Sequence, residues 1–345
     1  LRLLAAHARA FARSPRGWFS TLALAWRTRP PGLKAMLWQM FYFLEAGVLA
    51  EHLRARGVQH LHNHFGNSSC SVAMLASAMS GIPFSFTEHG PAIFFEAERW
   101  AIGEKIARAR FVVAISHFCR SQLMLFSRPA DWGKIAIVHC GVAPSAYGRE
   151  TRGAFGKRLI FVGRLDPVKG APLLIEAFAR VLPDHPDARL TIVGDGSSRA
   201  GAEARARELG IAASITFAGF RAQSEVARML EEADLLVLPS FAEGVPVVLM
   251  EAMASHIPVI ASRVAGVQEL VEDGVTGFTV PPGDVPTLAG RIGRILSDPE
   301  AARRMGKTGR QVVEAEFDIA GESAWLAEVL RGNALGRLRP GDSTA

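Results

Sequence analysis

Short apolar runs alternate with helix-like stretches along most of the chain from residue 58 onward. The apolar runs predict strands, and they cover residues 58–62, 83–87, 111–115, 135–139, 159–163, 190–194, 215–218, 235–239, 259–261 and 277–280. Helices are expected between them, for example over 69–79, 172–181, 224–232 and 247–254. Strand and helix in repetition indicate parallel sheets covered on both faces.

The polar, glycine-containing stretch 147–157 divides these elements, with four strands before it and six after it. We therefore expect two α/β domains, each a doubly wound sheet, over 1–150 and 151–318. A C-terminal helix and tail follow over 319–345, and packing against the first domain is one option for them. The length of 345 residues suits two domains of ordinary size.

The composition is that of a globular protein, since apolar residues make up 49% and charged residues 21% of the chain. No stretch approaches the roughly 18 uninterrupted apolar residues that a membrane span requires. The richest stretch, 35–50, contains Gln39 and Glu45 and predicts a buried or interfacial helix. The three cysteines lack metal or redox spacing, which favours a reduced compartment and a cytoplasmic location.

The formal net charge is +6, and much of the basic excess lies before residue 60, among large aromatic residues. This mixture suggests contact with an anionic membrane surface, peripherally on the inner face of the plasma membrane. A solvated helical face over a core stripe fits the same pattern, so both interpretations stay open. We expect no nucleic-acid partner. The chain begins at Leu1 without a secretory signal, so we expect a fragment or a misplaced start.

The first chemical motif is FVGRLDPVKG over 161–170, at a strand-to-helix junction. Gly163 and Arg164 follow the strand, and Lys169 precedes a helix that starts near Pro172. Two cations beside the free N–H groups of a helix can hold a diphosphate. Taken alone, solvated loop cations explain the motif equally well.

A second motif, IVGDG over 192–196, ends the next strand. Its glycines, Gly194 and Gly196, would let a backbone approach a ligand closely. The motif is only half of a dinucleotide fingerprint, because Arg199 stands where the last glycine is required. By itself it is a weak signal.

The third motif, SFAEGVPVVLMEAMASHIPVIAS, follows the strand 235–239 and carries Glu243 in a loop and Glu251 in a helix. The first carboxylate can accept hydrogen bonds from sugar hydroxyls, and the second can hold both hydroxyls of a ribose. Gly244 and the first amides of the helix beginning near Val247 would face phosphates. Alternatively, Glu243 caps the helix and Glu251 is a solvated side chain. Because the two glutamates occur together within this motif, we favour a ligand site.

Together the motifs resemble those of glycosyltransferase family 4, also called glycosyl transferases group 1, which are retaining enzymes of the GT-B fold. Glu243 and Glu251 match its two glutamates separated by seven residues. Residues 163–165 with 169–170 match its Gly-Arg-Leu and Lys-Gly motif, 193–196 its Val-Gly-Asp-Gly loop, and 269–278 its closing Glu-Leu-Val to Thr-Gly-Phe run. The matches span the whole second domain.

The resemblance implies two Rossmann-like domains facing across a cleft, an acceptor-side domain and then a domain that binds a UDP- or GDP-sugar, with no other cofactor. It implies that Arg164 and Lys169 offset charge on the departing diphosphate, that Glu243 contacts the transferred sugar and that Glu251 holds the ribose. The other expected nucleotide contacts are Gly163, Gly194, Gly196, Gly219, Phe220, Gly244, Val247 and Val248. The expected acceptor is a glycan or a lipid-linked glycan of bacterial surface polysaccharide synthesis. Family members usually begin with a strand and a Gly-rich loop that this chain lacks, so we expect the first domain to be incomplete at its start.

In the first domain, FSFTEHG places His89 where the family has its active-site histidine, which the resemblance implies is catalytic and reaches the donor sugar. His60, His62 and His64 alternate, so on a strand they would share a face. A metal triad is conceivable there, but a packed strand end is the favoured interpretation and no metal site is expected. Because no Asp-x-Asp triplet occurs in the chain, we expect a metal-independent mechanism.

Other nucleotide-binding enzymes and non-catalytic proteins are the competing interpretations of this sequence. An oxidoreductase or epimerase would need a complete Gly-x-Gly-x-x-Gly, which fails at Arg199, and no P-loop motif occurs. A degenerate protein that binds nucleotide-sugars without catalysis, or a membrane-associated interaction module, is the alternative that remains.

Overall fold

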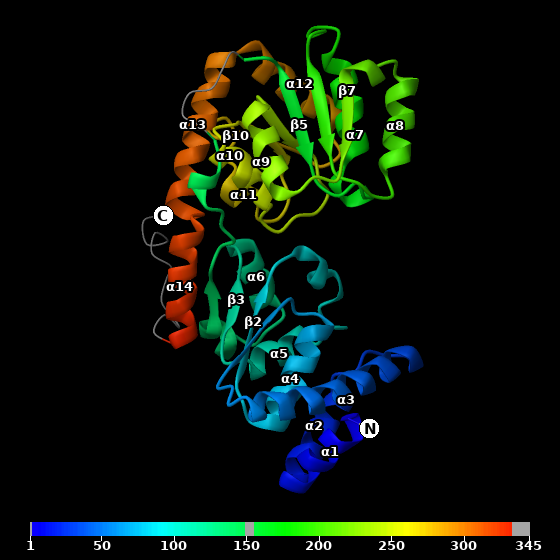
Figure 1. The fold of residues 1–345 in the computed structure, drawn as a ribbon, viewed down its shortest axis with the longest axis vertical. Helices are drawn as coiled ribbons and strands as arrows, with labels where there is room; N and C mark the ends of the chain where they lie inside the picture. Colours follow the sequence, from blue (N-terminus) through cyan, green and yellow to red (C-terminus); the bar gives the residue numbers. More distant parts are fainter. Residues whose placement is uncertain (1, 149–154, 333–345) are drawn as a thin grey trace. The chain divides into compact units, whose positions relative to one another are not determined.

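The computed structural model describes residues 2–148 and 155–332, and residues 149–154 of the expected linker lie outside them. The chain divides into two compact units. Of the described residues, the first unit comprises those up to Val138 and those from Trp325 to Gly332, and the second comprises those within His139–Ala324. Each unit contains one parallel sheet with helices packed around it (Figure 1).

The first unit is built on a four-stranded parallel sheet in the order β1-β2-β3-β4. The strands are β1 (Leu61–His64), β2 (Phe84–Glu88), β3 (Val112–Ala114) and β4 (Ile135–Ile137), and the helices between them are α4 (Ser68–Ser80), α5 (Ile102–Arg108) and α6 (His117–Leu125). All four expected strands are present. The expected double winding is not seen in this sheet, because the described residues before β1 form helices and supply no strand on its other side.

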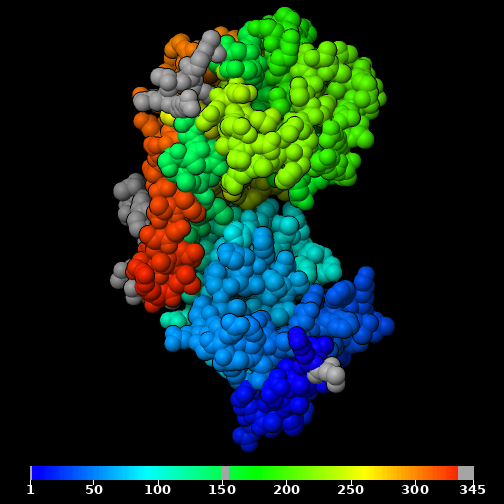
Figure 2. All heavy atoms as spheres, in the orientation of Figure 1, coloured from blue at the N-terminus to red at the C-terminus, as the bar shows by residue number. Residues whose placement is uncertain are grey.

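Three helices precede the sheet: α1 (Arg2–Arg13), α2 (Pro15–Arg27) and α3 (Leu33–Ala55). The helix expected over 35–50 is α3, which buries one face of small and apolar residues against α1, α2 and α4. His7 of α1 joins the three, since its ring accepts a hydrogen bond from Trp18 Nε1 at 3.0 Å and lies 3.1 Å from the carbonyl oxygen of Leu44. In Figure 2 the blue atoms of these helices form one continuous region of the surface.

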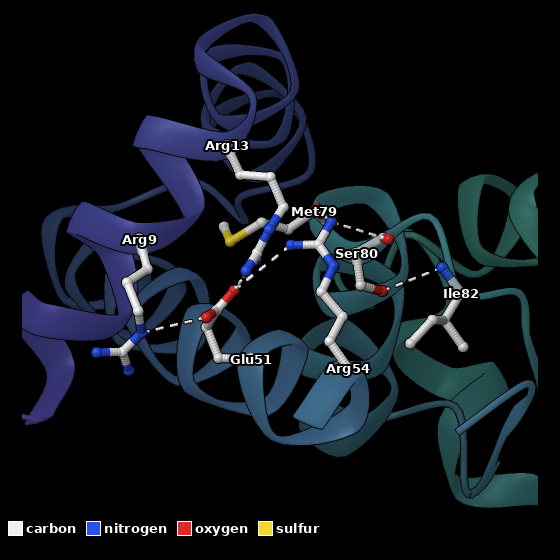
Figure 3. A network of polar contacts seen from close by, with 7 residues as sticks. All are labelled: Arg9, Arg13, Glu51, Arg54, Met79, Ser80 and Ile82. Atoms are coloured by element: carbon white, nitrogen blue, oxygen red, sulfur yellow. Dashed lines mark hydrogen bonds and ion pairs between the residues drawn. The ribbon is translucent and has the colours of Figure 1, made fainter. Parts of the chain in front are cut away.

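Polar contacts fix α1 and α3 onto the rest of the first unit (Figure 3). Glu51 of α3 accepts hydrogen bonds from Arg9, at 3.2 Å, and from Arg13 of α1. Arg54, one turn further along α3, donates to the carbonyl oxygens of Met79 and Ser80 at 3.0 and 2.9 Å. These carbonyls end α4, so a cation binds where the helix dipole is negative.

The last helix, α14 (Ile319–Arg331), contributes to the core of the first unit through its second half. Val329 is buried there with side chains of β3, β4 and their flanks, and Trp325 and Leu326 pack against the same cluster. Trp325 Nε1 donates to the carbonyl oxygen of Ile137 at 2.8 Å, which fixes the indole on the sheet.

The second unit is a six-stranded parallel sheet in the order β10-β9-β8-β5-β6-β7. Its strands are β5 (Arg158–Val162), β6 (Arg189–Val193), β7 (Ile215–Gly219), β8 (Leu235–Leu238), β9 (Val259–Ser262) and β10 (Gly277–Val280). Its helices are α7 (Ala171–Val181), α8 (Arg199–Glu208), α9 (Gln223–Glu232), α10 (Val247–Ala254), α11 (Val267–Leu270), α12 (Val285–Ser297) and α13 (Pro299–Glu316). The six expected strands and the double winding are confirmed. β6 and β7 follow β5 on one side and β8 to β10 are added on the other, so the strand order reverses between β5 and β8. Ligands of such sheets bind at that point, beyond the carboxyl ends of the strands.

Among the helices of residues 2–148 and 155–332, none has both the length and the apolar content needed to cross a bilayer.

Candidate active site

The loops after β5, β6 and β8 are joined by backbone hydrogen bonds at the reversal point of the second sheet. Gly163 N–H donates to the carbonyl oxygen of Val193 at 3.0 Å, and Leu165 N–H donates to that of Asp195 at 2.8 Å. Phe241 N–H, after β8, donates to Val168 at 2.8 Å. The three motifs found in the sequence therefore form one continuous surface, although 73 residues separate Val168 from Phe241.

The motif glycines are required for this joining. Gly194 has φ of +132°, and a Cβ there would lie 1.9 Å from the carbonyl oxygen of Gly163. Gly170 has φ of +68°, and its Cβ would lie 2.1 Å from the carbonyl oxygen of Pro239. Gly196 is similarly close to Leu165. Gly194 and Gly196 thus make room for the backbone of the neighbouring loop, and their contact with a nucleotide stays a prediction.

Lys169 and Glu243, predicted for the diphosphate and the sugar, meet in this surface. Lys169 Nζ lies 2.6 Å from Glu243 Oε1. Glu243 is buried, and the start of α10 has no side-chain cap. The alternative in which Glu243 caps that helix is therefore wrong. Arg164, the other predicted cation, is mostly exposed and pairs with Asp166 at 3.0 Å.

Glu251 is a buried carboxylate on the inner side of α10, so the alternative of a solvated side chain is also wrong. Tyr147 donates its hydroxyl proton to Glu251 Oε1 at 2.8 Å, and Gln223 Nε2 lies 3.4 Å from the same oxygen. Burial, reinforced by the bond to Glu251, raises the pKa of Tyr147 to about 12, so the phenol stays a donor. Sequence reasoning missed Tyr147 and Gln223; the only signal was that Tyr147 begins the predicted linker 147–157.

The first turns of α7 and α10 present backbone N–H groups without side-chain caps. Val247 and Val248 begin α10, and Val247 is exposed. Gly219 ends β7 in the left-handed region, with φ of +71°, and Phe220 after it is highly exposed. Uncapped helix starts combine free donors with the positive end of the dipole, which suits a phosphate group.

Tyr147 and Gln223 also line a cavity of about 610 Å³ within the second unit. Val247 is the predicted site residue on its wall, where Arg228 and Glu231 of α9 supply charge. The cavity is thus adjacent to the residues that hold Glu251 and to the start of α10.

In the first unit, His89 follows β2 and is held by its neighbours. His89 Nε2 lies 2.7 Å from His64 Nδ1, and the two rings stack with centroids 5.0 Å apart. Burial, with a smaller contribution from His64, lowers the pKa of His89 to about 4. The imidazole is therefore neutral near pH 7 and can accept as well as donate a hydrogen bond.

Glu88, which sequence reasoning also missed, fastens the His89 loop. One of its carboxylate oxygens accepts from the N–H groups of His89 and Gly90 at 3.1 and 3.4 Å, and the other accepts from Gly66 N–H at 2.7 Å. The fully buried Lys105 donates to the carbonyl oxygen of Gly66 at 2.7 Å. Burial raises the pKa of Glu88 and lowers the pKa of Lys105 to about 8.

His62 of β1 and His60, which directly precedes β1, bond to hydroxyl groups of β2. His62 contacts Ser85 Oγ at 2.7 Å and Thr87 Oγ1 at 2.9 Å, and His60 contacts Ser85 Oγ at 2.6 Å. Within the described ranges, no group of three or more His, Cys, Asp or Glu side chains is arranged to hold a metal ion.

Family models match both units of the chain. The model described as glycosyl transferases group 1 matches residues 154–312, and the model described as glycosyltransferase family 4 matches residues 7–146. The D-inositol 3-phosphate glycosyltransferase of Segniliparus rotundus is 30% identical over 326 residues, covering 85% of this chain and 72% of that protein. The chain belongs to the group 1 glycosyltransferases. The amylovoran biosynthesis glycosyltransferase AmsK of Erwinia amylovora is 32% identical over 233 residues, but that match covers 65% of this chain and 56% of AmsK.

Solved structures agree on the fold of this glycosyltransferase. Sucrose-phosphate synthase from Thermosynechococcus elongatus matches with a TM-score of 0.75 and 25% identity, over 84% of this chain and 77% of that chain. HepE of Anabaena, in complex with UDP, matches with a TM-score of 0.74 and 23% identity, over 84% and 82%. The two parallel-sheet α/β units are thus those of a GT-B glycosyltransferase, as the sequence predicts.

Proposed function

We propose that this glycosyltransferase transfers a sugar, with retention of configuration and without a metal ion, from a UDP- or GDP-sugar to a glycan or lipid-linked glycan. The observation that carries the proposal is the Lys169–Glu243 pair, 2.6 Å apart, in the strand-end surface of the second unit. A diphosphate and a sugar ring are contiguous parts of one donor molecule, and this pair presents a cation and a carboxylate side by side. The UDP in the structure of HepE supports a nucleoside diphosphate donor by fold likeness.

Breaking the bond between the anomeric carbon and the diphosphate places negative charge on the leaving oxygen. Lys169 and Arg164, with the free amides of α7 and α10, would stabilise that charge without reorganising, which is the usual source of the largest rate gains. Glu243 would accept hydrogen bonds from sugar hydroxyls, and Glu251 would hold the ribose. The departing phosphate would take the proton of the acceptor hydroxyl as that hydroxyl attacks the same face of the sugar.

His89 is proposed to contact the donor sugar through its neutral imidazole. Its ring orientation is fixed by His64 and its backbone by Glu88, so a hydrogen bond from His89 would be preorganised. The cations Arg164 and Lys169 can neutralise a diphosphate directly, which supports metal independence, as does the lack of an Asp-x-Asp triplet in the sequence.

The acceptor is proposed to belong to bacterial surface polysaccharide synthesis in the cytoplasm. The named role of AmsK in amylovoran biosynthesis supports this choice. A nucleotide-sugar-binding protein without catalytic activity is the alternative, and the donor site by itself fits it equally well.

The test measures nucleoside diphosphate release by purified protein from a panel of UDP- and GDP-sugars, with and without lipid-linked glycan acceptors. We expect release from one donor, stimulated by acceptor and insensitive to EDTA. Lys169→Gln should slow release strongly, whereas Lys157→Gln, at an exposed ion pair before β5, should not. Donor binding without turnover on any acceptor would support the non-catalytic alternative, and loss of turnover with EDTA would contradict metal independence.

A further inference from the structure

The net positive charge of the chain comes from its first three helices and the turns after them. Residues 2–56 contain nine Arg and Lys and two acidic residues, so they carry a formal charge of +7. The rest of the chain holds the other 30 basic and 31 acidic residues, of 39 and 33 in total, and is close to neutral. The basic character is therefore a property of α1–α3 and not of the donor-binding unit.

Much of this charge has no carboxylate to neutralise it. Glu51 is surrounded by Arg9, Arg13 and Arg54, and Arg27 pairs with Glu104 of α5 (Figure 3 shows the Glu51 cluster). The cations without an ion-pair partner among the described residues are Arg2, Arg16, Arg29, Lys34 and Arg56. Arg2, Arg16 and Lys34 lie on α1, α2 and α3, whereas Arg29 and Arg56 lie in the segments that follow α2 and α3.

The same helices expose large apolar side chains. Ten of the 21 large hydrophobic residues exposed in the described part of the chain lie between residues 3 and 48. On α2, Arg16, Phe19, Ala23 and Trp26 recur at helical spacing on the exposed face, opposite the buried Leu24. Phe19 is 57% exposed and Trp26 is 51% exposed.

The outer face of α3 is also apolar. Leu33, Lys34, Leu37, Trp38 and Phe41 lie on the side of the helix opposite its buried face, and Trp38 and Phe41 are 52% and 55% exposed, with ring centroids 6.0 Å apart. A helix that is apolar on both sides is normally enclosed by other parts of a protein or placed against lipid. Arg29 lies over the Trp26 ring at 3.8 Å, which places a cation beside an exposed aromatic.

We propose that the exposed faces of α2 and the first half of α3, with their flanking Arg and Lys residues, form a docking surface for an anionic membrane. Trp and Phe side chains would enter the boundary between head groups and acyl chains, and the unpaired cations would bind phosphate head groups. Charge complementarity selects this occupant. A two-fold dimer through the same face would bring two segments of charge +7 together, which is unfavourable.

The test is co-sedimentation of the full chain with vesicles of phosphatidylcholine alone and of phosphatidylcholine with phosphatidylglycerol, without any sugar nucleotide. Each basic residue at an anionic surface contributes a factor of about five in binding, so Arg16→Gln with Lys34→Gln should weaken binding to the anionic vesicles about 25-fold. Trp38→Ser with Phe41→Ser should weaken it by about tenfold or more, because apolar area no longer enters the interface.

Matched controls separate a surface effect from general charge or polarity. Arg207→Gln with Lys307→Gln removes one exposed Arg on α8 and one exposed Lys on α13, and it should leave vesicle binding unchanged. Phe95→Ser should also leave binding unchanged, although the Phe95 side chain is even more exposed than that of Phe41. Circular dichroism and thermal unfolding check that each variant is folded. Equal partitioning to neutral and anionic vesicles, or equal losses in the control variants, would overturn the proposal.

Other occupants of this surface give different results. A dimer that dissociates in the Trp38→Ser variant during analytical ultracentrifugation, with vesicle binding unaffected, would assign the face to a second copy. Binding to polyglutamate as strong as to anionic vesicles, and independent of Trp38 and Phe41, would assign it to an acidic protein. Because no donor is present in these assays, their outcome is independent of the proposed transferase reaction.

Discussion

Tyr147 gives the most specific prediction, because its hydroxyl group holds the carboxylate expected to bind ribose. Tyr147→Phe removes the 2.8 Å hydrogen bond to Glu251 Oε1 and leaves that oxygen with Gln223 Nε2 at 3.4 Å. The ring itself is buried and is kept in the variant, so packing changes little. The change is therefore confined to the two hydrogen bonds of the hydroxyl group, the one to Glu251 and the 3.3 Å bond that it accepts from Gln223 Nε2.

The magnitude follows from the charge and burial of Glu251. A hydrogen bond to a charged group contributes about 1.5–3 kcal/mol, and the lost donor leaves a buried carboxylate less restrained. If about half of this appears in nucleotide binding, the Kd for UDP rises about three- to tenfold, since about 1.4 kcal/mol corresponds to a factor of ten. The ribose is remote from the reacting carbon, so KM for the donor should rise while kcat changes little.

Isothermal titration calorimetry with UDP measures the first effect, and initial rates at varied donor concentration measure the second. Tyr42→Phe is a matched control, since Tyr42 is the only other tyrosine of the chain and lies on α3 of the first unit. If Tyr147→Phe loses stability but binds UDP within twofold of the wild-type affinity, Tyr147 is merely structural. That result would contradict a role of Tyr147 in nucleotide binding.

Three further predictions concern separate features. Lys169→Gln should lower kcat by roughly 100-fold or more in a coupled assay of nucleoside diphosphate release, whereas Lys157→Gln should not, and equal rates would contradict the role of the cation. Gly170→Ala should destabilise the protein by at least about 1–3 kcal/mol in urea unfolding, because φ is +68° and the new Cβ meets a carbonyl oxygen. Gly290→Ala, with open space around it on α12, should be neutral or slightly stabilising. Burial lowers the pKa of His62 to about 4 from an ordinary 6.5, so the unfolded chain binds more protons than the folded chain between these pH values. The free energy of unfolding should therefore fall as the pH drops from 6.5 to 4, and it should fall less in His62→Gln. The same pH dependence of stability in the variant and the wild type would contradict the lowered pKa of His62.

All ten strands could be predicted from the sequence because most are short apolar runs that the sheet buries on both faces; β1, with the sequence LHNH, and β7 are only partly buried. The boundaries moved by a few residues at most, as in β1, where the expected 58–62 became Leu61–His64. The helix over 247–254 was also predictable, since it follows directly from the run VVLMEAMA. The local pattern of apolar residues is enough to predict a strand or helix where consecutive residues are buried.

The supports of the site could not be predicted, because they come from residues distant in sequence. Tyr147 and Glu251 are 104 positions apart, and Glu88 and Gly66 are 22 apart. No local periodicity specifies such pairs. The glycines show the same limit: Gly194 was recognisable in its motif, but only the fold reveals that it makes room for the carbonyl oxygen of Gly163.

The double winding predicted for the first sheet was wrong, because it depended on the structure of the residues before β1. Double winding requires strands on both sides of the first one, and the residues before β1 read as helical and basic. Their apolar and charged pattern predicted helices correctly for α3, yet which faces of α2 and α3 stay exposed was visible only once the buried faces were known.

The most direct test of the central claim is a crystal structure of this protein with UDP. We expect the diphosphate beside Lys169 and the first turns of α7 and α10, and the ribose hydroxyls on Glu251, with Tyr147 still bonded to that carboxylate. UDP bound elsewhere, with Lys169 and Glu243 still paired and no nucleotide contact to Glu251, would contradict it.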